Sequence, residues 1–156
     1  MRPIAATLVS RLQEQNLQIR TAESCTGGLI MAALTDISGA SSVVDRGIVS
    51  YSNEAKKELL GVNEYTLSTY GAVSAEVAFE MVKGISGSPS VAALSVTGVA
   101  GPGGGTAEKP VGTVWIGALV PNKEPIIKHY LFDGDRSSIR HQTVEAACTQ
   151  LLSLLD

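Results

Sequence analysis

The sequence lacks the features that several protein classes require. Two cysteines and two histidines, scattered along the chain, predict neither a disulfide framework nor a structural zinc site. The 12 basic residues are outnumbered by 15 acidic ones, whereas a protein that binds duplex nucleic acid normally carries a basic surplus. No apolar run approaches the ~20 residues of a membrane span, and no signal peptide stands at the N-terminus. We therefore expect a cytoplasmic protein with no nucleic-acid or membrane partner.

The residues that are present suit a globular α/β protein. Hydrophobic residues make up 44% of the 156 and charged residues 17%, so a sizeable core can form and global disorder is excluded. Sixteen glycines beside only 4% aromatic residues indicate many tight turns around a core of Val, Leu, Ile and Ala. We expect residues 1–156 to form a single domain.

Hydrophobic periodicity predicts alternating strands and helices. Helices are expected at about residues 4–12, 24–35, 54–60, 64–70, 74–85 and 135–151, and strands at 17–23, 47–51, 91–97, 111–120 and 126–132. The four-residue connection 121–124 predicts that the last two strands form an antiparallel hairpin. Helices between the earlier strands favour parallel pairing there. The expected fold is a three-layer α/β/α domain with a mixed, mostly parallel sheet.

Polar residues follow three of the predicted strands. The first strand runs through Glu23 into Ser24, the second ends at Tyr51 with Lys56 in the next helix, and the third ends at Thr97. The carboxyl ends of parallel strands lie on one edge of an open sheet, and ligands bind in the crevice there. Ser24, Tyr51, Lys56 and Thr97 are therefore expected to meet, although they span much of the sequence.

Two neighbouring residues are candidate nucleophiles, Ser24 and Cys25. A serine at a strand-to-helix turn can use free backbone N–H groups to stabilise an oxyanion, or it can be a plain helix cap. Cys25 is the stronger nucleophile but needs a base, and the patterns around His129 and His141 place both at the surface. The other cysteine, Cys148, falls on the apolar face of the last helix and is expected in the core.

Lys56 is then the candidate base. A Ser–Lys pair works only if desolvation or a nearby cation lowers the ammonium pKa. The spacing by itself favours a different interpretation, in which Lys56 and Lys57 share a solvated helix face with the acidic residues beside them. Tyr51 likewise has two interpretations from its position: a functional residue, or an aromatic residue that only packs at a strand end.

A glycine-rich loop and two arginines are candidates for anion binding. Residues 98–105 could present backbone N–H groups to a phosphate, but they match neither common phosphate-binding motif, and a structural turn is the equal alternative. Arg136 and Arg140 stand at the start of the last helix. Arginine suits bidentate phosphate binding, although many exposed arginines bind nothing specific.

Taken together, the segments resemble the CinA C-terminal domain family, whose stand-alone members are nicotinamide mononucleotide deamidases of the PncC type. The longer architecture of the family adds an N-terminal molybdopterin-binding-like domain, which we expect to be absent here. The matching stretches cover nearly the whole chain in order, which makes the resemblance specific. They are AESCTGG at 22–28, YSNEAK at 51–56, GAVS at 71–74, TGVAGPGG at 97–104 and KPVGTV at 109–114.

The resemblance implies hydrolysis of the carboxamide of nicotinamide mononucleotide to nicotinate mononucleotide and ammonia, a step of the pyridine nucleotide cycle. It implies Ser24 as the nucleophile, Lys56 and Tyr51 as proton-transfer partners, and Arg136 as an assisting arginine, with Arg140 as an alternative. It implies no metal and no organic cofactor, and small domains of this kind commonly form dimers. The implied substrate-binding residues are Thr26, Gly27 and Gly28 of the oxyanion turn, and Thr97, Gly98, Gly101, Gly103 and Gly104 of the nucleotide pocket.

Two other functions remain open from the sequence. One is a nucleotide-binding regulatory module without turnover, as the competence and damage-inducible naming of the family suggests; intact Ser24, Tyr51 and Lys56 argue against it. The other is an amidase that uses Cys25. Ammonia release by the purified protein separates the first from an enzyme, and Cys25→Ala separates the second.

Overall fold

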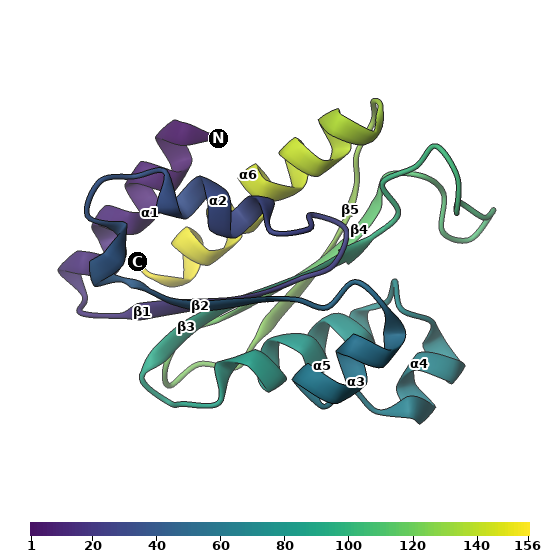
Figure 1. The fold of residues 1–156 in the computed structure, drawn as a ribbon, viewed down its shortest axis with the longest axis horizontal. Helices are drawn as coiled ribbons and strands as arrows, with labels where there is room; N and C mark the ends of the chain where they lie inside the picture. The colour runs from purple at the N-terminus through teal and green to yellow at the C-terminus, as the bar shows by residue number, and fades with distance from the viewer.

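A computed structural model describes residues 1–156, and its centre is a five-stranded mixed sheet in the order β2-β1-β3-β4-β5 (Figure 1). β1 pairs in parallel with both β2 and β3, and β4 pairs antiparallel with both β3 and β5. The strands are β1 (Gln18–Glu23), β2 (Val44–Val49), β3 (Val91–Gly98), β4 (Thr113–Leu119) and β5 (Ile126–Leu131). The predicted mixed sheet and its antiparallel hairpin are confirmed.

Helices cover both faces of this sheet, which confirms the predicted α/β/α layers (Figure 1). The helices α1, α2 and α6 lie over one face, and α3, α4 and α5 lie over the other. Each layer encloses its own buried apolar cluster, of 21 and 9 residues respectively. The helices are α1 (Arg2–Glu14), α2 (Leu29–Thr35), α3 (Asn53–Leu60), α4 (Glu64–Tyr70), α5 (Ala75–Ser86) and α6 (Arg136–Leu154), with a 3-10 turn at Ala40–Ser42.

The strand order creates a crevice at one edge of the sheet. The chain leaves β1 through α2 toward β2 on one side, and the next connection crosses over α3, α4 and α5 to β3 on the other side. The carboxyl ends of β1, β2 and β3 consequently share one edge, and the connections diverge there. This is the place in open α/β sheets where ligands bind.

β2 is the strand whose predicted position is wrong. It was expected at 47–51 and runs from Val44 to Val49, because its register is set by pairing of Ile19 with Val44 and of Glu23 with Val49. β2 is an edge strand and carries Asp45 and Arg46. An edge strand that is half exposed has no continuous apolar signature in the sequence.

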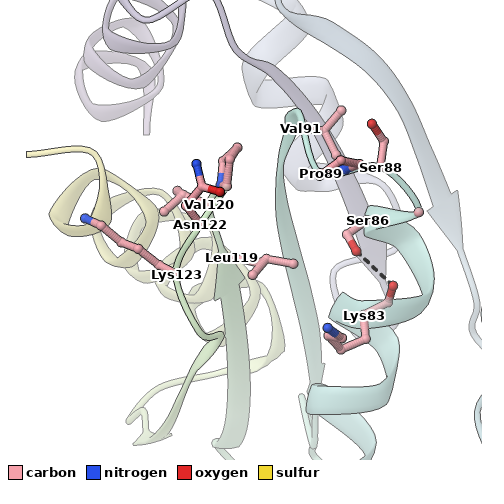
Figure 2. Close-up of a pocket in the computed structure, with 11 residues that line it drawn as sticks. Lys83, Ser86, Ser88, Pro89, Val91, Leu119, Val120, Asn122 and Lys123 are labelled. Atoms are coloured by element: carbon pink, nitrogen blue, oxygen red, sulfur yellow. Dashed lines mark hydrogen bonds between the residues drawn. The ribbon is translucent and has the colours of Figure 1, made fainter.

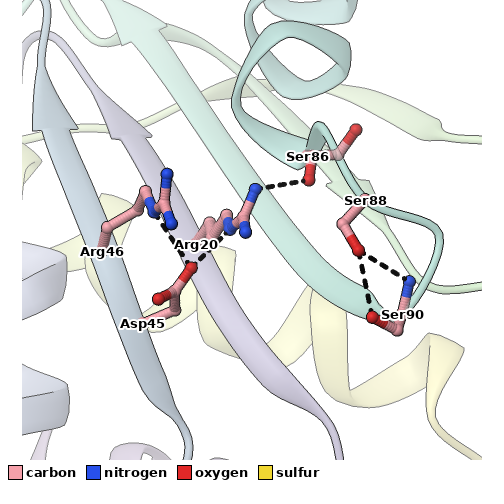
Figure 3. Close-up of polar contacts among 6 residues, drawn as sticks. All are labelled: Arg20, Asp45, Arg46, Ser86, Ser88 and Ser90. Atoms are coloured by element: carbon pink, nitrogen blue, oxygen red, sulfur yellow. Dashed lines mark hydrogen bonds and ion pairs between the residues drawn. The ribbon is translucent and has the colours of Figure 1, made fainter.

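A cluster of charged side chains joins β1 and β2 toward the amino ends of these strands, away from the crevice (Figure 3). Arg20 Nε lies 2.6 Å from the Asp45 carboxylate and its Nη1 donates to Ser86 O at 2.9 Å, while Arg46 Nε lies 3.0 Å from the same carboxylate. The hydrogen bond from Arg20 holds the pKa of Asp45 below its usual value of 3.8. Arg20 of β1 therefore joins Asp45 of β2 to the end of α5.

Asp45→Asn is expected to lower Tm at pH 7 by on the order of 2 °C. Because the pKa of Asp45 is lowered in the folded protein, its stabilising effect is present above about pH 4 and is lost as the pH falls through the folded-state pKa. Melting curves of both proteins from pH 7 downward should converge. Asp36→Asn is the matched control, since Asp36 and its partner Arg2 are both exposed; an equal loss in both variants would contradict a specific role for Asp45.

None of the helices combines the length and the apolar character that crossing a bilayer requires.

Candidate active site

A cavity of about 310 Å³ opens at the carboxyl edge of β1, β2 and β3. It brings together residues from the ends of three strands, from α3, from the glycine loop and from the first turn of α6. Of the residues singled out in the sequence, those that line it are Ser24, Cys25, Tyr51, Lys56, Thr97, Gly98, Gly101, Gly103, Gly104 and Arg136.

Ser24 and Lys56 form a hydrogen-bonded pair in this cavity. Ser24 follows the last residue of β1 and is buried, with 8% of its surface exposed. Lys56 projects from α3, which begins where the Ser52 hydroxyl accepts from the N–H of Ala55. The Lys56 Nζ lies 3.0 Å from the Ser24 Oγ, which is the contact that a nucleophile and its base require.

The surroundings of Lys56 disfavour its charged form relative to that of an exposed lysine. The side chain is 1% exposed, and its Nζ otherwise contacts only two backbone carbonyls, Ser50 O at 2.7 Å and Tyr51 O at 3.3 Å. Burial lowers the pKa of Lys56 from its usual value of 10.5. An uncharged amine has two N–H donors for the carbonyls and one lone pair for the Ser24 hydroxyl. The same three partners can therefore serve the neutral amine that a base requires.

The expectation that Lys56 shares a solvated helix face is therefore wrong. That description fits its neighbour Lys57, whose Nζ forms ion pairs with Glu54 and Glu64, both at 2.7 Å. Lys56 precedes Lys57 by one position on α3, and from this position its side chain points inward, toward the ends of β1 and β2. Lys56 shares the buried face of α3 with Leu60, and the packing of that face, rather than the local charge pattern, sets this difference.

Cys25 lacks what a cysteine nucleophile needs. Burial raises the pKa of its thiol to about 11, so it stays protonated at neutral pH. Neither histidine lines the cavity: His129 lies on β5 against the Trp115 ring, and His141 lies on α6 with its Nδ1 at Ser137 O. Cys148, on α6, is fully buried in the hydrophobic core of the protein, as predicted. Of the two candidate nucleophiles, Ser24 is the one that contacts the candidate base Lys56.

Arg136 connects three parts of the cavity wall. Its Nη1 donates to Gly101 O at 2.7 Å, and its Nη2 donates to the Tyr51 hydroxyl at 3.1 Å. The Asp135 carboxylate caps α6 by accepting from Ser138 N, which fixes the first turn that carries Arg136. The Tyr51 side chain is 59% exposed, and its hydroxyl contacts neither Ser24 nor Lys56.

The loop after β3 presents free backbone donors beside Arg136. The N–H groups of residues 100, 101, 103, 104 and 105 form no hydrogen bond within the protein. A side chain at Gly98 would stand 2.7 Å from a Val114 methyl group, and Gly101 has a φ of 79°. Glycine is therefore required for this path. Successive unpaired N–H groups next to a guanidinium form a site for an anion.

Four predicted substrate-binding residues lie outside the lining of the cavity. Thr26, Gly27, Gly28 and Arg140 are absent from it, and the N–H groups of the glycines are already paired: Gly27 N donates to Ser24 O at 3.0 Å, and Gly28 N donates to Glu23 Oε1 at 3.1 Å. Arg140 instead donates from α6 to Cys25 O at 3.1 Å and to Thr26 O at 2.9 Å. The oxyanion donors expected at Gly27 and Gly28 are not available.

Glu23 is the residue of this region that sequence reasoning passed over. The predicted helix start at Ser24 is wrong: α2 begins at Leu29, and neither Ser24 nor Thr26 caps it. The buried Glu23 carboxylate takes that place by accepting from Ile30 N at 3.0 Å and Met31 N at 3.1 Å. An acidic residue at the end of a buried strand, just before a glycine turn, is the signal that could have indicated it.

A second cavity of about 350 Å³ lies near the opposite edge of the sheet, between the end of α5 and the β4–β5 turn (Figure 2). Its two lysines do not converge. The Lys123 side chain extends away from the hollow, and its Nζ donates to Leu154 O at 2.9 Å. The lining holds neither a nucleophile with a base nor an arginine, so it does not compete with the Ser24 cavity as an active site.

Known proteins resemble this chain along its length. It is 48% identical over 140 residues to the nicotinamide-nucleotide amidohydrolase PncC of Enterobacter agglomerans, covering 89% of this chain and 85% of that protein. It is 50% identical over 138 residues to a competence-damage inducible protein of Thermoanaerobacter sp., covering 88% of this chain but only 33% of that protein. The chain thus spans about a third of such longer relatives.

Solved structures and a family model agree with these relatives. The fold superposes with a TM-score of 0.95 on the competence/damage inducible protein CihA of Agrobacterium tumefaciens, at 44% identity over 99% of this chain and 95% of that one. A protein of Enterobacter asburiae, described as competence or damage-inducible, gives a TM-score of 0.92 at 32% identity over 98% and 96%. The model of the CinA C-terminal domain matches residues 1–155. The chain therefore belongs to the CinA C-terminal domain family.

Proposed function

We propose that the protein is a nicotinamide-nucleotide amidohydrolase that converts nicotinamide mononucleotide to nicotinate mononucleotide and ammonia. The observation that carries the proposal is the 3.0 Å contact between Lys56 Nζ and Ser24 Oγ, in a cavity that also holds an anion-binding loop. Family membership and the name of the Enterobacter agglomerans relative support the same activity.

The first half of the proposed reaction is acyl transfer to Ser24. The Ser24 oxygen attacks the carboxamide carbon while its proton moves to the neutral Lys56 amine, giving a tetrahedral intermediate and a Lys56 ammonium. The ammonium then gives that proton to the departing NH₂ group. The C–N bond breaks, ammonia leaves, and nicotinate mononucleotide remains bound to Ser24 as an ester.

The second half is hydrolysis of that ester. Lys56, neutral again, takes a proton from a water that attacks the ester carbon, and then returns the proton to the Ser24 oxygen as the C–O bond breaks. The backbone N–H of Cys25 is our candidate oxyanion donor, because it follows the nucleophile and is paired with no oxygen of the protein. Gly27 and Gly28 cannot serve, since their N–H groups are occupied.

We assign the 5′-phosphate of the substrate to Arg136 and the free N–H groups of residues 100, 101, 103, 104 and 105. A phosphate that displaces the Gly101 carbonyl from the guanidinium would gain a charge-assisted contact. Tyr51 is hydrogen-bonded to Arg136, so we expect it to orient the guanidinium and to line the site. A proton-transfer role for Tyr51 remains a prediction that this geometry does not require.

Arg136→Ala is expected to lower kcat/KM for the mononucleotide by roughly 10- to 10²-fold, because it removes a charge-assisted phosphate contact. Turnover of nicotinamide riboside, which carries the same amide without the phosphate, should change little. Ammonia release from each substrate measures both values.

Two arginine variants serve as controls for this test. Arg140→Ala should lower turnover of both substrates alike, because Arg140 contacts the turn after Ser24 rather than the cavity. Arg46→Ala, on the exposed edge strand, should change neither. Equal kcat/KM for mononucleotide and riboside in the wild type would overturn the phosphate assignment. Binding of the mononucleotide without ammonia release would favour a regulatory nucleotide-binding module instead.

A further inference from the structure

We infer that Glu23 is a positioning residue whose buried carboxylate holds the Ser24 turn in its reactive geometry. The inference rests on the proposed function, because it concerns how Ser24 meets Lys56. Glu23 lines no part of the cavity and so is not expected to touch substrate.

The Glu23 carboxylate is enclosed by donors and by no cation. Its side chain is 1% exposed, and no arginine, lysine or histidine forms an ion pair with it. Oε1 accepts from the Thr26 hydroxyl at 2.6 Å, from Gly28 N and from Ile30 N, and Oε2 accepts from Met31 N. Four hydrogen bonds at the positive end of α2 compensate the burial of a charge.

These contacts fix the turn from both ends. Thr26 and Gly28 lie within the turn and bind back to the residue that precedes Ser24, and Gly27 N closes the turn by donating to Ser24 O. On the outer side, Arg140 holds the carbonyls of Cys25 and Thr26. The peptide groups on either side of Ser24 therefore have little freedom to rotate.

The main chain of Glu23 is also connected to Lys56 through Ser50. Glu23 O accepts from Ser50 N at 2.8 Å and from the Ser50 hydroxyl at 3.3 Å, and Ser50 O in turn accepts from Lys56 Nζ at 2.7 Å. One residue thus joins the turn that carries the nucleophile to the strand end that holds the base. A displacement of about 1 Å between reacting groups can cost ~10² in rate.

Glu23→Gln is the direct test, because it keeps the shape but turns an N–H donor toward a backbone N–H at one side-chain position. We expect kcat to fall about 10²-fold while KM changes by less than about threefold. Thr26→Val removes one of the four donors and should lower kcat about fivefold, and Thr26→Ser, which restores the hydroxyl, should recover it. The Thr26 pair keeps the inference testable if Glu23→Gln fails to fold.

A stability control separates positioning from general support of the fold. Gln150 is buried in α6 and donates to Ile116 O and Ile126 O, away from the cavity. Gln150→Leu should lower Tm and leave kcat within about twofold. If Glu23→Gln and Thr26→Val likewise lower Tm but leave kcat unchanged, Glu23 is only a structural cap and the inference is overturned.

Labelling of Ser24 by a fluorophosphonate, followed by mass spectrometry, makes failure of the inference distinguishable from failure of the proposed function. The reagent needs an activated serine but no nicotinamide substrate. Slower labelling in Glu23→Gln and Thr26→Val, with recovery in Thr26→Ser, supports the inference even if the wild type releases no ammonia. Unchanged labelling rates in the two impaired variants would contradict it even in an active enzyme.

Discussion

Replacement of Ser24 with alanine is expected to lower kcat for nicotinamide mononucleotide by roughly 10³-fold or more. The Ser24 hydroxyl lies 3.0 Å from Lys56 Nζ and is the group whose proton Lys56 would take, and no other nucleophile in the cavity contacts a candidate base. The fold should persist, because the turn is held by Glu23 and Arg140 rather than by the Ser24 side chain. Ammonia release and circular dichroism measure the two results.

Cys25→Ala is the matched comparison at the adjacent position. The thiol has a pKa raised to about 11 by burial and no histidine beside it, and alanine keeps the backbone N–H, so this variant should retain most of its activity. An ester trapped on the wild-type protein by acid quench should map to Ser24. Loss of activity in Cys25→Ala with retention in Ser24→Ala would reverse the assignment of the nucleophile.

The sequence predicted most elements because their signals are local. Ser52, Ser74 and Asp135 cap α3, α5 and α6, and each accepts a backbone N–H three residues ahead, so the signal stands in the sequence beside the helix that it starts. The helix 64–70 was predicted with the bounds of α4. The meeting of Ser24 and Lys56 followed from the rule that parallel strands end at one edge.

The features that were missed depend on contacts between distant segments. Glu54, Lys56 and Lys57 are charged residues of one short helix, and their spacing does not show which side chain is buried. Lys56 is the buried one, because its side chain reaches the ends of β1 and β2. The start of α2 was placed too early because its cap is a carboxylate five residues before the helix N-cap Gly28, a spacing that no short capping motif describes. Arg140 resembled a substrate contact, but its partners are backbone carbonyls 114 and 115 residues away.

Removal of the Lys56 amine should be as damaging as loss of the nucleophile. Lys56→Met keeps most of the side-chain volume and should lower kcat by roughly 10³-fold. Lys56→Arg keeps a positive charge, but a guanidinium has a far higher pKa than an ammonium and stays protonated, so it cannot accept the Ser24 proton and should be equally impaired. Single-turnover ammonia release, which reports acylation alone, should show that this step slows.

The pH dependence follows from the same burial. Desolvation disfavours the ammonium and lowers the pKa of Lys56 below 10.5, so the neutral, reactive amine is formed at a lower pH than in an exposed lysine. A Cys25 thiolate would oppose this shift, but the thiol stays protonated up to a pKa of about 11. kcat/KM of the wild type should therefore rise with pH through a pKa below 10.5, and Lys56→Arg should lose that rise.

Rescue by small amines distinguishes a base role for Lys56 from a purely electrostatic one. In Lys56→Ala, a primary amine such as ethylamine can enter the space of the missing side chain and accept the proton from Ser24. The restored rate should follow the concentration of the free base rather than that of the ammonium, and should increase with the basicity of the amine. Rescue that tracks the ammonium ion, or high activity in Lys56→Arg, would leave Lys56 as an electrostatic residue and would require another base for Ser24.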